Sequence, residues 1–211
     1  MQIETLFIIL ILILSVVIHE VAHGYAANMQ GDPTARLAGR LTLNPIKHID
    51  LLGSLIIPGL LVLSSSPFLF GYAKPVPYNP YNLRNQRWGE AIVAGAGPFT
   101  NVLIALFFGL IVRLGTGFAF VTPAFVEIAS AVVFINLLLA VINMIPLPPL
   151  DGSKVLASLL PFGLAQSYGR LRMMLEGNMF LAFGLVILLV FFFGSTFARF
   201  IFFLSSLILG F

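Results

Sequence analysis

At residues 18–24 the chain reads Ile-His-Glu-Val-Ala-His-Gly, and this stretch closes an apolar run that begins after Thr5. On a helix, side chains four residues apart lie on the same face, so His19 and His23 can offer imidazole nitrogens to one metal ion. Glu20 lies one step round the helix and can reach a water molecule on that ion. The H-E-x-x-H spacing is typical of sites where two histidines bind zinc and the glutamate is the general base.

The setting of this motif strengthens the prediction of a metal. Residues 6–18 are almost all Leu, Ile, Val and Phe. Two imidazoles and a carboxylate beside such a segment are costly to bury without a partner, and a metal ion supplies one. A lone histidine is usually a structural residue, but this pair, with a glutamate between, is not easily explained that way. We therefore predict one Zn²⁺ per chain.

The composition indicates a membrane protein. Hydrophobic residues make up 59 % of the 211 residues and charged residues 9 %, whereas a soluble domain is about 25 % charged. We predict an all-α polytopic membrane protein with one membrane-embedded domain over residues 1–211. The net charge of +3 is too small and dispersed for a nucleic-acid surface. Because the chain has no cysteine, no thiolate can be a ligand or nucleophile.

The apolar runs predict about five transmembrane helices. They lie at about residues 3–27, 89–114, 121–145, 178–193 and 196–211. A tight turn at Gly194 and Ser195 is expected to separate the last two runs. In the second run, Asn101 is expected to form a helix–helix hydrogen bond. No basic residue precedes the first run, whereas Arg36 and Arg40 follow it. The positive-inside rule then places the N-terminus outside and the metal motif toward the cytoplasmic side.

The region between the first two spans is expected to be irregular. Alternating apolar and polar residues at 35–43 predict a short strand or hairpin at the surface. Residues 51–70 are apolar but broken by Gly and Pro and flanked by basic residues, which favours a re-entrant or interfacial hairpin over a span. Residues 71–89 are rich in Pro and Tyr and are a candidate wall of a wet site. Either 35–43 or 71–82 can supply a strand edge for an extended substrate.

A catalytic zinc site has three protein ligands and an open position, so a third ligand is needed. Position 29 is Met, which excludes the longer metzincin motif. Asp151 follows a proline-rich stretch, residues 146–149, that cannot continue a helix and holds the chain extended. It also lies at the histidines' depth in the predicted topology. Asp151 therefore ranks first, Glu90 at the cytoplasmic edge second, and His48 third.

Three stretches of the chain, taken in order, form one recognisable pattern. They are His19-Glu20-Val21-Ala22-His23, Gly97-Pro98-Phe99-Thr100-Asn101 and Asn143-Met144-Ile145-Pro146-Leu147-Pro148-Pro149-Leu150-Asp151-Gly152. Together they resemble the site-2 protease family of intramembrane zinc metalloproteases, in a compact prokaryotic-type form. The resemblance covers about residues 15–160 and leaves the C-terminal spans at 178–211 unassigned. It implies that His19, His23 and Asp151 bind zinc, that Glu20 activates water, and that Asn143 holds the substrate carbonyl or oxyanion.

The resemblance implies a zinc metalloendopeptidase that cleaves transmembrane or membrane-associated substrates with a zinc-activated water. Its partners would be the transmembrane-helix substrate and the lipid bilayer of a prokaryotic inner membrane. The alternative is a metal-ion transporter in which His, Glu and Asp line an ion path. Few acidic residues lie in the outer half of the predicted spans, which disfavours transport. An inactive relative that only binds membrane proteins is a further alternative, although the chain keeps all the nominal chemistry.

Overall fold

Four long apolar helices dominate the computed structural model, which describes residues 2–56, 60, 63, 72–115 and 121–210. They are α1 (Gln2–Met29), α4 (Gly89–Leu114), α5 (Pro123–Asn143) and α8 (Met179–Leu209). Each is long and apolar enough to cross a membrane. Within the described residues there are helices and no strand. The prediction of an all-α polytopic membrane protein is confirmed at this level.

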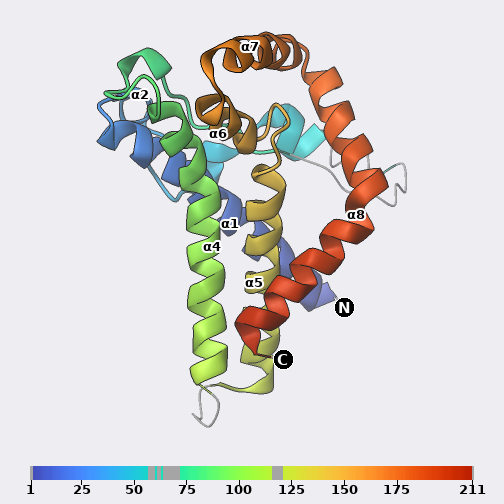
Figure 1. Cartoon of the computed structure of the whole chain (residues 1–211). Helices are drawn as coiled ribbons and strands as arrows, with labels where there is room; N and C mark the ends of the chain where they lie inside the picture. Colours follow the sequence, from blue (N-terminus) through green and yellow to red (C-terminus); the bar gives the residue numbers. More distant parts are fainter. Residues whose placement is uncertain (1, 57–59, 61–62, 64–71, 116–120, 211) are drawn as a thin grey trace.

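The fourth and fifth predicted spans form one continuous helix. α8 runs for 31 residues, and the turn expected at Gly194 and Ser195 is absent, because both residues are helical. Each predicted half was shorter than the about 20 residues that a span requires. One helix of this length extends about 46 Å at 1.5 Å per residue. It therefore exceeds the hydrocarbon layer and slants across the bundle, as Figure 1 shows. The count of five spans is not confirmed.

The strand predicted at 35–43 is also not found. Residues Thr34–Leu37 form the one-turn helix α2, and Pro45–His48 form a 3₁₀ helix. The Asp32 carboxylate accepts hydrogen bonds from the N–H and the hydroxyl of Thr34, which favours a helical turn at this point. Gly39 then adopts a φ of 65°, a left-handed conformation that interrupts any extended run. Local hydrogen bonding therefore outweighs the alternation in the sequence.

Most of the hairpin predicted at 51–70 lies outside the described residues. Leu51–Ile56 form one turn of π-helix, so the choice between a re-entrant hairpin and a span stays a prediction. Residues 72–79 have no regular secondary structure, and Pro80–Asn82 form a 3₁₀ turn. The irregular backbone predicted for 71–89 is confirmed for its described part.

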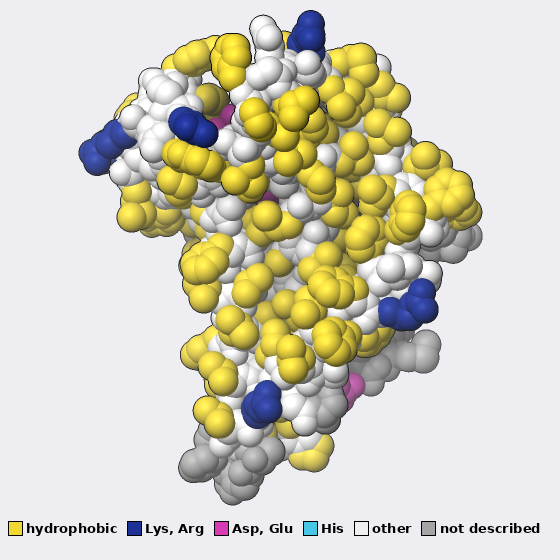
Figure 2. All heavy atoms as spheres, in the orientation of Figure 1, with side chains coloured by type: hydrophobic (Ala, Val, Ile, Leu, Met, Phe, Trp, Pro, Cys, Tyr) yellow, Lys and Arg dark blue, Asp and Glu magenta, His cyan; other side chains and the backbone are white. Residues whose placement is uncertain are grey.

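The bundle has two distinct ends, one with the short helices and one toward the chain termini (Figure 1). The N- and C-termini lie toward one end of the bundle, where α8 packs on the antiparallel pair α4 and α5. That packing buries one apolar cluster: Ala105, Val112, Ala129, Val133, Leu137, Ile201 and Leu209. The helices α6 (Asp151–Leu159) and α7 (Phe162–Glu176) lie at the other end. Hydrophobic side chains cover most of the face of the molecule drawn in Figure 2, as expected for a surface in contact with lipid.

Asp32 fixes the loop that follows α1 to the segment that leads into α4. Its side chain is fully buried, and besides Thr34 it accepts from the Asn79 backbone N–H at 2.6 Å and from Asn82 Nδ2 at 2.8 Å. Burial opposes ionisation of this carboxyl, but its bonds with Thr34, Asn82 and Asn79 lower its pKa below the ordinary value of 3.8.

Asp32→Asn should therefore destabilise the folded protein at neutral pH, by about 1.5–3 kcal/mol for hydrogen bonds to a charged group. Because the folded pKa of Asp32 is the lower one, its stabilising contribution is present above pH 3.8 and is lost as the pH falls through the folded pKa. Thermal unfolding in detergent should show a gap between wild type and variant that closes on acidification. A gap that stays constant with pH would contradict this assignment.

Candidate metal centre

Two histidines and one aspartate meet where α1 passes the start of α6. His19 Nε2 lies 3.1 Å and His23 Nε2 3.2 Å from Asp151 Oδ2. All three side chains are buried, and their ligand atoms lie within 4.8 Å of one another. The first-ranked third residue is thus the one that the structure brings to the two histidines. The group could hold one metal ion.

The histidine rings are fixed through their other nitrogens. His23 Nδ1 is 2.7 Å from the carbonyl oxygen of Val93, which can only accept, so this nitrogen carries the hydrogen. His19 Nδ1 bonds to Oδ1 of Asn101. The Nε2 atoms of both rings face Asp151, and histidines that bind a metal through Nε2 hold their Nδ1 hydrogen in such a bond.

The donor set fits zinc. Two imidazole nitrogens and a carboxylate oxygen converge, and a metal ion between them would replace the hydrogens that otherwise join the rings to Asp151. Two nitrogens and one carboxylate oxygen match the three protein ligands of a catalytic zinc site, whose tetrahedral ligand atoms lie about 3.3–3.6 Å apart. Gly97 of α4 closes one side of the site, because a Cβ there would lie 2.6 Å from His19 Nε2 and from His23 Nε2.

Asp151 owes its position to the turn that precedes it. α5 ends at Asn143, the proline-rich stretch follows, and Gly152 packs so closely that a Cβ would lie 2.2 Å from the Met144 carbonyl oxygen. The second carboxylate oxygen of Asp151 is 3.9 Å from Lys154 Nζ. Burial opposes ionisation, but His19, His23 and Lys154 lower the pKa of Asp151 below its ordinary value. The carboxylate form needed for metal binding is therefore favoured.

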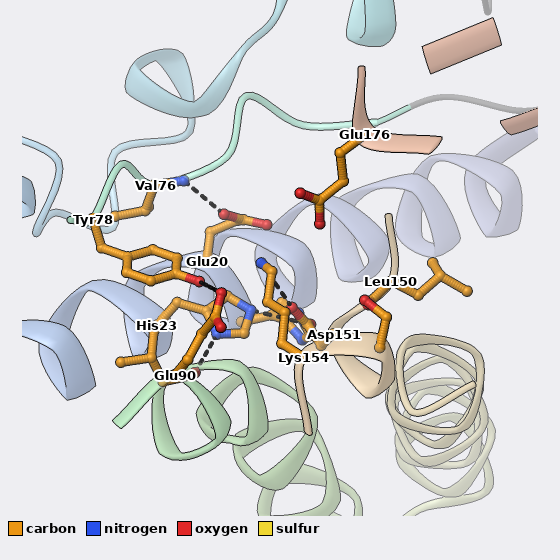
Figure 3. Close-up of polar contacts among 12 residues, drawn as sticks. Glu20, His23, Val76, Tyr78, Glu90, Leu150, Asp151, Lys154 and Glu176 are labelled. Carbon is orange, nitrogen blue, oxygen red and sulfur yellow. Dashed lines mark hydrogen bonds and ion pairs between the residues drawn. The ribbon is translucent and has the colours of Figure 1, made fainter. Parts of the chain in front are cut away.

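Glu20 is half-buried beside His23 and is held by the irregular segment 72–79. Its Oε2 accepts a hydrogen bond of 2.9 Å from the Val76 N–H. Pro75 and Pro77 have no N–H, so Val76 carries the one donor of this tripeptide, and Glu20 uses it. In Figure 3, Glu20 lies between Val76 and His23. The strand edge predicted for 71–82 is therefore poor in donors at this point.

The second- and third-ranked ligand candidates are engaged elsewhere. Glu90, in the first turn of α4, pairs with the Arg172 guanidinium and accepts from the Tyr78 hydroxyl at 3.3 Å. Figure 3 shows the hydrogen bond from the Tyr78 hydroxyl to Glu90. His48 is buried, with Nε2 at 2.9 Å from the Thr42 carbonyl oxygen. Neither belongs to the group that could hold a metal.

Asn143 is a predicted site residue that makes no hydrogen bond to the three metal-site residues in the described structure. It ends α5, and its Nδ2 donates to the Leu139 carbonyl at 3.0 Å. Among the described residues no hydrogen bond joins it to His19, His23 or Asp151.

Sequence reasoning quoted Gly97 in a motif without giving it a role in the site, and it missed two further groups that shape the site. These are the Val76 N–H and Asn136, which accepts from Asn101. A buried asparagine in an apolar span was the available signal for Asn136. The bond from Asn101 to Asn136 also confirms the helix–helix hydrogen bond predicted for Asn101.

Comparison with known proteins shows to which family this geometry belongs. The family model described as "Peptidase family M50" matches residues 7–132, which is more than half of the chain and includes the H-E-x-x-H motif. The chain belongs to peptidase family M50. The resemblance to the site-2 proteases is thereby confirmed.

Two curated relatives agree with this family. The chain is 37 % identical over 174 residues to "Putative zinc metalloprotease YwhC" of Bacillus subtilis (strain 168), covering 77 % of this chain and 76 % of that protein. It is 31 % identical over 143 residues to "Putative zinc metalloprotease Rip2" of Mycolicibacterium smegmatis (strain ATCC 700084 / mc(2)155), covering 66 % and 52 %. No solved structure matches the chain significantly. The M50 protein is a zinc metalloprotease of the intramembrane type, which favours hydrolysis over the transport alternative.

Proposed function

We propose that this M50 protein cleaves transmembrane segments of other proteins, with zinc held by His19, His23 and Asp151. The observation that carries the proposal is the convergence of two Nε2 atoms and one carboxylate oxygen, with both Nδ1 positions already bonded. Zinc, when bound, lowers the pKa of a water molecule toward neutrality and polarises a carbonyl group.

Glu20 is proposed as the group that moves the proton. Its Oε2 is held by the Val76 N–H, which leaves Oε1 to take a proton from water and later give it to the leaving amine. Asn143 is proposed to hold the substrate carbonyl. Its amide has two N–H donors, and one bonds to Leu139. The second can be directed at the oxygen on which charge develops.

The proposed substrate is a transmembrane helix that unwinds locally. Inside a helix the carbonyl groups are bonded and shielded, and the metal group is buried, so an extended stretch must enter the site. Except for Arg113 and Arg199, the 11 Lys and Arg residues lie in the segments between α1 and α4 or in α6 and α7. The positive-inside rule supports a site facing the cytoplasm, in the inner membrane of a prokaryotic cell.

The test uses the purified full chain in liposomes, with synthetic membrane-spanning peptides as substrates. We expect cleavage inside the apolar region of at least one peptide, loss of cleavage with a zinc chelator, and recovery on adding zinc. Product masses give the cleaved bond. Cleavage that is indifferent to the chelator, or zinc-loaded protein that cleaves none of a varied peptide set, would oppose the proposal. Zinc flux across the same liposomes would instead support a transporter.

A further inference from the structure

Asn136 is a fully buried polar residue in the middle of the spanning helix α5. Its Nδ2 donates to Ser15 Oγ of α1 and to the Val132 carbonyl, both at 2.9 Å. Its Oδ1 accepts from Nδ2 of Asn101 in α4 at 2.7 Å. A polar side chain at membrane depth is costly, and one that satisfies both ends of its amide calls for a functional reason. Asn136 bonds to none of the three residues of the metal group.

These bonds form a chain that reaches His19. The carbonyl of Val132 can only accept, so the Asn136 nitrogen must face it and the Asn136 oxygen must face α4. Asn101 then has to present its nitrogen to Asn136 and its oxygen to His19. With an oxygen opposite, Nδ1 of His19 must carry the hydrogen. One backbone carbonyl thus determines the direction of every bond up to the ring.

We propose that Asn136 is a positioning residue that selects the tautomer of His19 through Asn101. It rests on the proposed role of His19 as a zinc ligand. Without Asn136, the amide of Asn101 loses the acceptor that fixes its orientation, and a flip presents an N–H to His19 Nδ1. The ring then carries its hydrogen on Nε2, the nitrogen that faces Asp151 at 3.1 Å. A protonated Nε2 cannot bind a metal.

A purely structural role for Asn136 makes a different prediction. The same bonds join α1, α4 and α5, so loss of Asn136 could weaken helix packing without any effect on zinc. The two roles separate in a double-mutant comparison, because a residue that acts through Asn101 has nothing left to do once Asn101 is gone. The tautomer of His19 also separates the two roles, because a loss of helix packing alone does not change it.

The experiment uses the full chain in detergent, with Asn136→Leu, Asn101→Leu and the double variant. Zinc affinity is measured by competition with a chelator and stability by thermal unfolding. Asn136→Leu should weaken zinc binding about tenfold, at the lower end of the about 10–100-fold typical of groups that support metal ligands. In the Asn101→Leu background it should cause no further loss. If Asn136→Leu does not fold, Asn136→Ala replaces it without added bulk.

The nitrogen chemical shifts of labelled histidine give the second measurement. The chain has three histidines, and His19→Ala identifies the signals of His19. In zinc-free wild type Nδ1 of His19 should carry a hydrogen, and in Asn136→Leu that hydrogen should be wholly or partly lost from Nδ1. Asn136→Asp keeps an acceptor for Asn101 and should restore both the tautomer and the zinc affinity.

Ser205→Ala is the matched control. Its hydroxyl is buried in the spanning helix α8 and bonds within that helix to the Ile201 carbonyl at 2.8 Å, so its loss should leave zinc affinity unchanged. An Asn136→Leu protein that unfolds earlier but binds zinc within twofold of wild type would overturn the inference. An equal loss in the Asn101→Leu background would also overturn it. Wild type that binds no zinc would instead defeat the proposed function.

Discussion

Gly97→Ala is expected to lose its zinc and all proteolytic activity. The added Cβ would lie 2.6 Å from Nε2 of both His19 and His23, the two nitrogens that face Asp151. The rings cannot withdraw without breaking their Nδ1 bonds to Asn101 and the Val93 carbonyl. Two ligands are disturbed at once, so zinc affinity should fall by more than the about 10–100-fold that loss of one supporting group costs. Zinc content after gel filtration and cleavage of a membrane-spanning peptide are the measurements.

Gly95→Ala is the matched control in the same helix. A Cβ at Gly95 meets nothing within 4 Å, and replacing a helical glycine by alanine stabilises the helix by up to about 1 kcal/mol. Gly95→Ala should therefore keep its zinc and its activity. A Gly97→Ala protein that retains one zinc ion per chain and cleaves normally would show that the metal lies elsewhere.

The parts of the site that follow local rules could be predicted from the sequence. The four-residue spacing places His19 and His23 on one helix face, and the prolines before Asp151 end α5 at the right depth. Local rules could not exclude Glu90 and His48 as the third ligand, because both share this end of the molecule with Asp151. Their partners, Arg172 and Thr42, engage them elsewhere.

Contacts between distant residues account for most of what the sequence did not predict. The bond from Val76 to Glu20 spans 56 positions and that from Asn136 to Ser15 spans 121, so neither leaves a periodic pattern. The long helix α8 was predicted as two spans because only local residue types were considered. A glycine and a serine inside an apolar run predict a turn locally, but nothing in the described structure supports one, and the unbroken helix satisfies its own backbone.

Glu20→Gln is expected to abolish cleavage while zinc remains bound. Glu20 is not among the three residues whose ligand atoms converge, so the metal group should be intact. The Gln side chain keeps an oxygen to accept from the Val76 N–H, so segment 72–79 should keep its place. What the variant loses is the carboxylate that takes up a proton, which is worth about 10²–10⁴-fold in rate. Turnover of a membrane-spanning peptide and zinc content, measured on one preparation, give both results.

Glu176→Gln provides the comparison that separates proton transfer from a general change in charge. Glu176 lies at the end of α7, is exposed, and pairs with Arg172 at 2.9 Å. The same change of a carboxylate to an amide there should leave turnover within about twofold, because exposed ion pairs contribute at most about 1 kcal/mol. A Glu20→Gln protein with one zinc ion per chain that still cleaves at the wild-type rate would remove Glu20 from the mechanism. The proton would then have to be taken by another group near the metal site.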